Sequence, residues 1–188
     1  MIDALTSFQP RPGGDATAPL IRSSRDSAFL YSYSGPAQAL SVTQEQIIRI
    51  NDAVRRWNSA FGRDLDARLR DAGISTSQLV PLNIDTDGVI TSEMDYPEKE
   101  VVENMFISDP LLTEQFRMLA ADMNRVAELR VSFSYRQEWA SSGPLERRQL
   151  WKRYSALSNL LNLLAGQAIL ADRRLHWSGY QLALSGSH

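Results

Sequence analysis

The sequence predicts a mainly α-helical domain of four or so helices with a C-terminal antiparallel helix pair, a small antiparallel β-hairpin patch and a flexible N-terminal leader. Apolar residues recur every three or four positions over most of the chain after residue 43, which is typical of helices that bury one face. Asp87-Gly88 between short apolar runs is a strong hairpin signal, because glycine adopts the positive φ of tight turns. These patterns predict a leader over residues 1–42 and one helical domain over residues 43–188.

The predicted leader is rich in Ser, Ala, Pro and Gly and has no sustained hydrophobic period. This composition favours an extended or flexible segment. Its one apolar cluster, residues 29–33, could form a short strand or an anchor that ties the leader to the body of the domain. Polar, Ser-rich leaders without a cleavable signal also occur on substrates of bacterial specialised secretion systems, so export by a non-classical route is an expectation.

The first helix is predicted to begin after Thr43, because Thr43 and Gln46 have the spacing of a capping box and helical apolar spacing follows. Gly73 ends this helix. Gly62 lies inside the pattern and weakens it by roughly 1 kcal/mol relative to Ala. We therefore expect a kink or a break into two helices at Gly62.

Two further helices are predicted over residues 97–106 and 110–139, each with proline at its first helical position. The longest and most apolar helical pattern covers residues 144–175. A helix that is apolar over so much of its circumference belongs in a core. The connection at residues 141–144 is short, which predicts that the two long helices are antiparallel.

After Asp172 the pattern changes to alternation, and residues 176–183 are predicted to form a terminal strand that pairs with the hairpin at residues 82–91. If the helices leave part of the apolar face of residues 150–170 uncovered, that patch would be an interaction site or a dimer interface.

Composition excludes several kinds of chemistry. The chain has no Cys, which excludes disulfides and thiolate metal sites. It has only two His, His176 and His188, which disfavours zinc sites and histidine-based triads. It contains no run of about 18 apolar residues, so we expect no membrane span. The chain has 18 Arg but only Lys99 and Lys152, a ratio that we interpret as the codon bias of a GC-rich bacterial genome.

The net charge of −2 is unevenly spread along the chain. Residues 83–114 hold nine acids and one Lys, a charge of −8, whereas residues 115–188 hold ten basic residues and five acids, a charge of +5. We expect the basic C-terminal part to pack against the acidic middle of the same chain. A nucleic-acid partner is not expected, because such proteins carry a coherent basic face.

The acidic stretch around the predicted hairpin has two interpretations. It is a simple turn, or it is a calcium-binding loop, because calcium prefers six to eight oxygen ligands and glycine allows the loop to turn sharply. The candidate ligands are Asn83, Asp85, Asp87, Glu93 and Asp95. An EF-hand is disfavoured, because its twelfth position would be Met94 and Pro81 would interrupt the entering helix.

The leading functional hypothesis is a non-enzymatic bacterial protein–protein interaction domain, cytoplasmic or exported without a classical signal peptide. It would bind a protein partner or a second copy of itself through a helical face. The alternative is a calcium-binding module that uses the acidic loop at residues 83–95, and calcium is the one cofactor considered. A third hypothesis, a hydrolase or lyase using carboxylates of the acidic middle, lacks any spacing that selects a catalytic pair.

Overall fold

The computed structural model describes residues 42–185, so the predicted leader lies outside the described residues except for Val42. This part of the chain forms five helices and one four-stranded antiparallel sheet. In chain order the elements are α3 (Gln44–Asp71), β1 (Val80–Ile84), β2 (Ile90–Thr91), α4 (Lys99–Ser108), α5 (Pro110–Ser141), α6 (Pro144–Leu163), β3 (Ala168–Ala171), β4 (Arg174–Trp177) and α7 (Ser178–Ser185). The predicted fold class, mainly α with a small antiparallel β patch, is confirmed.

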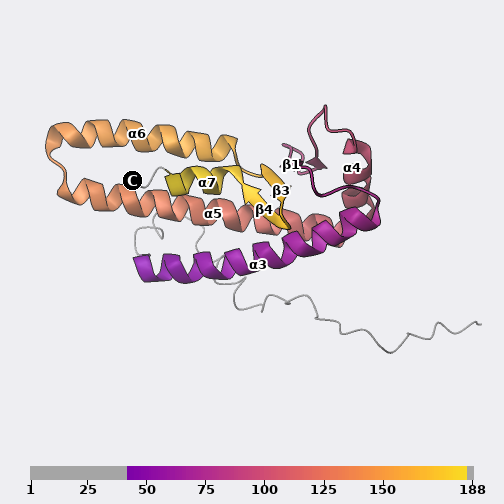
Figure 1. Cartoon of the computed structure of the whole chain (residues 1–188). Coiled ribbons are helices and arrows are strands. Elements are labelled where there is room, and N and C mark those ends of the chain that lie inside the picture. The colour runs from indigo at the N-terminus through magenta and orange to yellow at the C-terminus, as the bar shows by residue number, and fades with distance from the viewer. Residues whose placement is uncertain (1–41, 186–188) are drawn as a thin grey trace, which may run out of the picture.

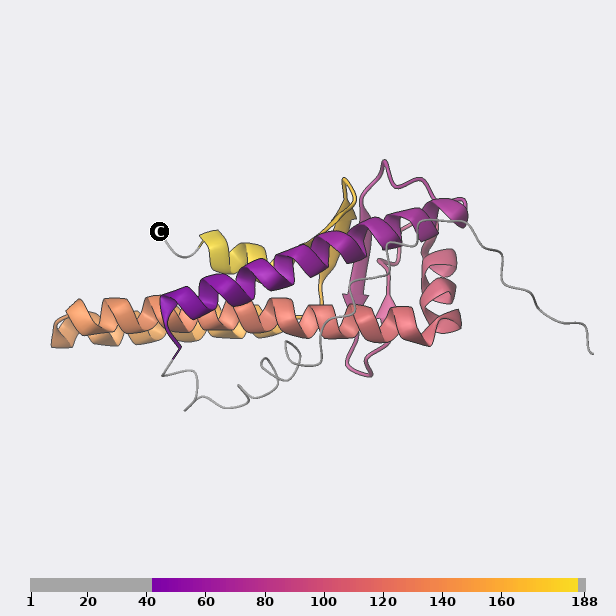
Figure 2. The same cartoon turned by 90° about the horizontal axis from the view of Figure 1, so that it is seen from below.

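Helix α5 is the central element of the fold. It is 32 residues long, and α3, α4, α6 and α7 all pack against it. Helix α6 runs beside α5 in the opposite direction, as the short loop between them predicts, and α3 crosses α5 obliquely (Figures 1 and 2). The sheet and α4 lie toward the N-terminal end of α5 (Figure 1).

Helix α3 begins with the predicted capping box. The Gln46 backbone amide donates to Thr43 Oγ1 at 3.3 Å, and the Thr43 amide donates to Gln46 Oε1 at 2.8 Å. Because both amides would otherwise lack partners in the first turn, this exchange marks the helix start. The predicted kink or break at Gly62 is wrong in its stronger form, since α3 is one continuous helix of 28 residues.

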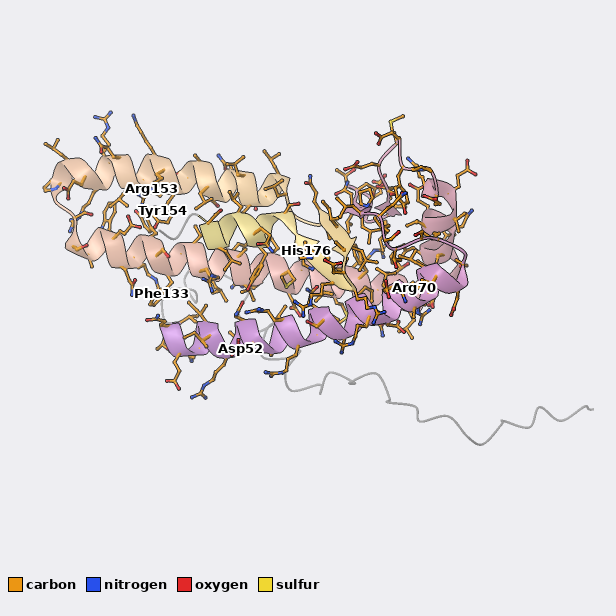
Figure 3. The ribbon with its side chains drawn as sticks, in the orientation of Figure 1. Asp52, Arg70, Phe133, Arg153, Tyr154 and His176 are labelled. Atoms are coloured by element: carbon orange, nitrogen blue, oxygen red, sulfur yellow. The ribbon has the colours of Figure 1, made fainter. Side chains whose placement is uncertain are left out.

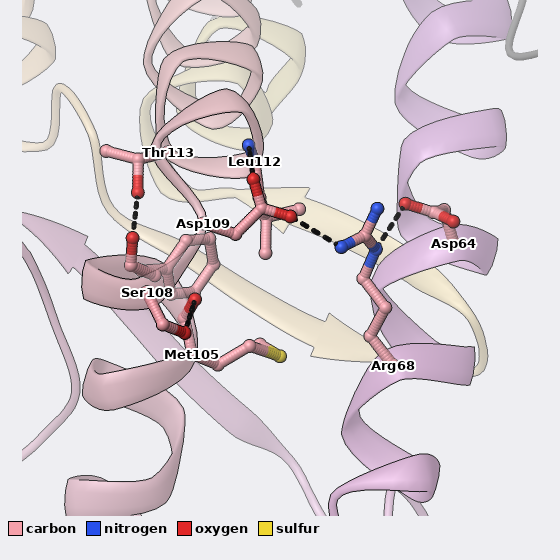
Figure 4. A network of polar contacts seen from close by, with 8 residues as sticks. Asp64, Arg68, Met105, Ser108, Asp109, Leu112 and Thr113 are labelled. Atoms are coloured by element: carbon pink, nitrogen blue, oxygen red, sulfur yellow. Dashed lines mark hydrogen bonds and ion pairs between the residues drawn. The ribbon is translucent and has the colours of Figure 1, made fainter. Parts of the chain in front are cut away.

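The start of α5 also follows its sequence signal. Asp109 Oδ1 accepts a hydrogen bond from the Leu112 amide at 3.0 Å, and Pro110 occupies the first helical position. Asp109 Oδ2 accepts a second hydrogen bond, from Arg68 Nη1 at 2.8 Å, which joins α3 to the α4–α5 corner (Figure 4). The Leu112 amide and the Arg68 guanidinium hold the pKa of the Asp109 carboxyl below its usual value.

Asp109→Asn is expected to reduce the loss of stability in acid. Because the pKa of Asp109 is lower in the folded state, its charge contributes stability that is present above the unfolded pKa, roughly 3.9, and is lost as the pH falls through the folded pKa. Urea unfolding at neutral pH and at about pH 3 should show a smaller difference for Asp109→Asn than for the natural chain. Asp52→Asn, an exposed change on α3, is the control, and equal losses in all three chains would contradict this prediction.

The C-terminal part corrects two predictions. The helix predicted over residues 144–175 ends at Leu163, and β3 and β4 follow it. The strand predicted over residues 176–183 is limited to its first two residues, because α7 begins at Ser178. An apolar run as short as residues 168–171 fits a buried strand as well as a helix, so periodicity alone could not separate the two.

Backbone pairing explains why a strand replaces the helix. Gly166, at φ +82°, follows the end of α6, and β3 then pairs with β1 in the register Val80↔Leu170 and Leu82↔Ala168. The turn to β4 is formed by two residues with positive φ, Asp172 and Arg173, as in the hairpin turns that match strand twist. The strand order is β2-β1-β3-β4, so the predicted hairpin pairs with β3 rather than with the terminal strand β4.

The core lies where α3, α4 and α5 meet β4. Phe116 is fully buried at its centre, with its ring centroid 6.1 Å from that of Phe61, 5.5 Å from that of Phe106 and 5.2 Å from that of Trp177. Asn58 of α3 connects the β3–β4 hairpin to this core. Its side chain accepts from the Trp177 indole N–H at 2.8 Å and donates to the Leu175 carbonyl at 2.9 Å.

The predicted core position of α6 is wrong. Of its 20 residues only Leu150, Tyr154 and Leu161 are buried, whereas α5 buries ten. The reason is position, since α6 packs on α5 and α7 and its other sides face outward (Figure 1). Within residues 42–185, no helix is both long enough and apolar enough to cross a membrane.

One contact between a C-terminal basic residue and the acidic middle joins α5 to the β1–β2 hairpin: Arg117 Nε donates to the Gly88 carbonyl at 2.7 Å. Other C-terminal arginines pair elsewhere. Arg125 pairs with Glu128 and Arg173 with Asp66. The charge pattern therefore identified the imbalance but not the partners.

Candidate functional site

A groove of about 740 Å³ runs between α5 and α6. Arginine, glutamate, serine and aromatic side chains of α5 form one wall, and serine, asparagine and aromatic side chains of α6 form the other. The principal lining residues are Arg125, Glu128, Ser132, Tyr135 and Arg136 on α5, and Trp151, Tyr154, Ser155, Ser158 and Asn159 on α6. Its volume is within the range of pockets that hold small ligands or several side chains of a peptide.

Side-chain size explains why the groove exists. Ser132 of α5 and Ser155 and Ser158 of α6 line it, and such small residues leave space between two helices that larger apolar residues would fill. Val131 and Leu161, which also line the groove, pack with Ala183 of α7 in a second core cluster. The helix pair is therefore closed on one side and open on the other.

A hydrogen-bonded cluster fixes the end of the groove nearest the α5–α6 loop. Tyr154 Oη donates to Glu138 Oε1 at 2.6 Å, and Arg153 forms an ion pair with the same carboxylate. The Tyr154 hydrogen bond lowers the pKa of Glu138, and burial raises the pKa of Tyr154. Figure 3 shows Arg153 and Tyr154 near the middle of α6.

Aromatic rings continue along the same end of the groove. The Tyr135 ring lies edge-on to the Tyr154 ring, with centroids 5.1 Å apart, and 5.4 Å from the Trp139 ring. The Arg147 guanidinium lies 5.1 Å from the Trp139 ring centroid, within the range of a cation–π contact. These contacts hold the groove wall in one arrangement.

Trp151 is the main exposed apolar side chain of the groove. It lines the groove while remaining 62% exposed. Tryptophan is enriched among the residues that dominate binding energy at protein interfaces, because it buries a large area at small entropic cost. The remaining surface of α6 also carries exposed leucines, namely Leu145, Leu160 and Leu163.

Arginines lie along the α5 wall. The Arg125 guanidinium pairs with Glu128 at 3.3 Å, and Glu128 also accepts from the Asn124 amide at 3.0 Å. Arg136 Nη2 donates to the Val42 carbonyl at 3.2 Å, and its guanidinium lies 5.6 Å from the Phe133 ring centroid. Val42, the first described residue, is therefore linked to the α5 wall through the Arg136 side chain, although Val42 itself packs in the core beside α3.

The groove offers little for acid–base catalysis. Glu128 is the single carboxylate among the described residues that line it, and the serines there have no histidine or cysteine beside them in the lining. A hydrolytic mechanism needs two groups with different proton affinities within reach of one substrate. The groups that line the groove are aromatic faces, hydroxyls, amides and guanidinium groups.

The predicted hairpin is confirmed, and its turn uses one of the candidate calcium ligands. Asp85 Oδ1 accepts hydrogen bonds from the Asp87 amide at 2.9 Å and the Val89 amide at 2.8 Å, and Gly88 has φ +78°. Asn83 pairs with Thr91 in the sheet. In the part of the chain that the structure describes, no group of three or more His, Asp or Glu residues is placed to hold a metal ion.

Calcium binding by Asn83, Asp85, Asp87, Glu93 and Asp95 stays a prediction, and thermal unfolding tests it. A calcium site would raise the melting temperature in excess calcium over that in EDTA, by several degrees at about a hundred times the dissociation constant, and Asp87→Ala would abolish the rise. Melting curves that coincide in calcium, magnesium and EDTA would remove this hypothesis and leave the stretch as a turn.

A second hollow, of about 390 Å³, lies beside the C-terminal end of α3. The nearly buried carboxylate of Asp66 pairs there with Arg70 at 2.6 Å and with Arg173 of the β3–β4 turn at 3.6 Å. These contacts attach the turn to α3. We assign this cluster a structural role, because its charges are already paired with one another.

The structure thus defines a mainly helical protein with a small antiparallel sheet and an open groove between its central helix α5 and its outer helix α6. No protein-family model, curated protein or solved structure matches this chain. Sequence reasoning identified the face of residues 150–170 as a conditional interaction site but missed the groove residues of α5. The serines at positions 132, 155 and 158, which break the apolar pattern of two long helices, are the signal that could have indicated it.

Proposed function

We propose that this chain is a non-enzymatic protein–protein interaction domain that binds a segment of another protein in the groove between α5 and α6. The observation that carries the proposal is the exposed ring of Trp151 in an open groove of about 740 Å³. Exposed aromatic rings at the edge of a hollow are typical of sites that take an apolar side chain of a partner. The bacterial origin and the export route stay predictions from composition.

The walls of the groove favour a partner of particular chemistry. Tyr135, Trp151 and Tyr154 provide aromatic faces that suit aromatic or aliphatic side chains. Arg125 and Arg136 make the α5 wall basic, and a carboxylate in the partner would compete with Glu128 for Arg125 and with the Val42 carbonyl for Arg136. We therefore expect a peptide segment with apolar anchors beside an acidic residue.

Selection from a displayed peptide library against the full chain tests this function. We expect enrichment of peptides with aromatic or aliphatic anchors and an acidic residue. In fluorescence anisotropy, Trp151→Ala should weaken binding of the selected peptides by at least about tenfold, because a tryptophan at the centre of an interface contributes about 2 kcal/mol or more.

Leu145→Ala is the matched control, because Leu145 is 87% exposed on the same helix and does not line the groove. The affinity of Leu145→Ala for the selected peptides should stay within about twofold of that of the natural chain. Failure to enrich any peptide, or equal affinity of Trp151→Ala and the natural chain, would contradict the proposal. A second copy of the chain is the other partner considered, and concentration-dependent dimerisation that Trp151→Ala abolishes would identify it.

A further inference from the structure

We propose that residues 28–33 of this same chain dock in the groove between α5 and α6 and compete there with the partner. The inference rests on the proposed function of the groove and adds its regulation. The segment, Ala-Phe-Leu-Tyr-Ser-Tyr, lies outside the described residues and is the apolar cluster of the N-terminal region. Three observations carry the proposal: where the chain enters the fold, how far the segment can reach, and what the groove is made of.

The chain enters the described fold beside Arg136 of α5. Val42 is only 3% exposed, and its carbonyl oxygen accepts a hydrogen bond from Arg136 Nη2 at 3.2 Å. Arg136 is also a lining residue of the groove. Val42 is therefore linked to a groove residue through one side chain.

The length of the tether fits the groove. Eight residues lie between Tyr33 and Val42, and the nine steps from Tyr33 to Val42 span up to about 30 Å when extended. The α5 wall from Arg136 to Arg125 covers eleven helical steps, or about 16 Å. Residues 28–33 can therefore reach every part of the groove. A tether of this length gives the segment an effective concentration on the order of millimolar, so weak contacts are enough to populate the docked state.

The chemistry of the segment complements the groove. Phe29, Leu30 and Tyr31 are the apolar anchors that the aromatic walls favour, and Asp26 precedes them as the acidic residue that Arg125 favours. This is the same chemistry that we expect of the partner segment. The docked segment would reduce the apparent affinity for a partner by the fraction of chains in which the groove is free.

Disulfide trapping tests the docking in the full chain, which has no cysteine of its own. The test pair is Ser32→Cys with Ser158→Cys, a groove residue, and the control pair is Ser32→Cys with Ala156→Cys. Ser158 and Ala156 are both exposed on α6, two positions apart and on different sides of the helix, so neither change should disturb the fold. Under mild oxidation, we expect the intramolecular disulfide of the test pair to form at least about tenfold faster than that of the control pair, because docking brings the two thiols together.

Mass spectrometry separates the outcomes. Equal rates for the two pairs would overturn the proposal. Disulfide-linked dimers in place of the intramolecular bond would also overturn it, because they assign the groove to a second copy of the chain. Replacing Phe29, Leu30 and Tyr31 by serine in the test pair should reduce its rate to that of the control, and no reduction would contradict the assigned anchors.

The two proposals fail separately. Fast trapping of the test pair with no enriched library peptide would keep the docked segment and remove the partner function. Enriched peptides with equal trapping rates of the two cysteine pairs would keep the partner function and remove the docked segment. If both hold, the chain with Phe29→Ser, Leu30→Ser and Tyr31→Ser should bind the selected peptides several-fold more tightly than the natural chain, because its groove is always free. Unchanged affinity would remove the competition.

Discussion

Phe116→Ala is expected to lower the free energy of unfolding by about 3–5 kcal/mol, which is the range for truncating a buried phenylalanine. Phe116 is fully buried, and its ring lies against Phe61 of α3, Phe106 of α4 and Trp177 of β4. These three partners come from separate parts of the chain. Loss of the ring would therefore leave a cavity at the one point where α5 contacts all of them.

Urea unfolding followed by circular dichroism measures this loss, since a folded domain of this size has about 5–15 kcal/mol of stability in total. Leu111→Ala is the control on the same helix, because Leu111 is exposed and its truncation should change stability by less than about 0.5 kcal/mol. A loss below about 1 kcal/mol for Phe116→Ala would mean that this junction is not the core of the fold.

Gly62→Ala is expected to destabilise the protein even though it replaces a glycine within a helix. Helix propensity alone favours the change by about 1 kcal/mol. However, a Cβ at Gly62 would lie 2.8 Å from the Arg173 carbonyl oxygen and 3.1 Å from Arg174 Cα. Overpacking costs typically 1–3 kcal/mol, and the cost is at the upper end when the contacted atoms are backbone. The net loss should be about 1–2 kcal/mol.

Thermal unfolding measures this balance, and Arg63→Ala at the next, exposed position of α3 is the matched control. Arg63→Ala should leave the melting temperature nearly unchanged. The opposite result, a higher melting temperature for Gly62→Ala, would mean that propensity outweighs the close approach and that the β3–β4 turn does not lie tightly on α3. From the sequence, Gly62 was interpreted as a weak point in the helix. In the fold, its missing side chain allows the β3–β4 turn to lie close to α3.

Local signals predicted those elements whose ends are decided within a few residues. The Thr43–Gln46 capping box, the Asp109-Pro110 helix start and the Asp87-Gly88 turn each appear where the sequence placed them. Each involves hydrogen bonds or φ angles of adjacent residues, so no distant partner is needed. The secondary structure of residues 164–185 was predicted wrongly. Whether residues 168–171 form a strand depends on pairing with Val80 and Leu82 of β1, about 88 positions earlier in the chain.

The candidate site was only partly accessible to sequence reasoning. The apolar face of residues 150–170 indicated a surface that would bind something if it were left uncovered. Within that range Leu150, Tyr154 and Leu161 are buried, whereas Trp151, Leu160 and Leu163 are exposed. The groove itself needed the relative placement of two helices, because it exists only where Ser132 of α5 and Ser155 and Ser158 of α6 line the same space. The tether at Val42 likewise depends on Arg136, 94 positions later in the chain.

By itself, the sequence determined that the chain after residue 42 is mainly helical, where its first helices begin, that one Asp-Gly hairpin interrupts them, and that the last two long helices run antiparallel. Only the tertiary structure decided that α5 rather than α6 is the centre of the core, that a β-hairpin follows α6, and that a groove opens between the two helices. The physical reason is the range of the interactions. Caps and turns are satisfied locally, whereas burial, strand pairing and side-chain gaps depend on residues that are distant in the sequence and adjacent only in the fold.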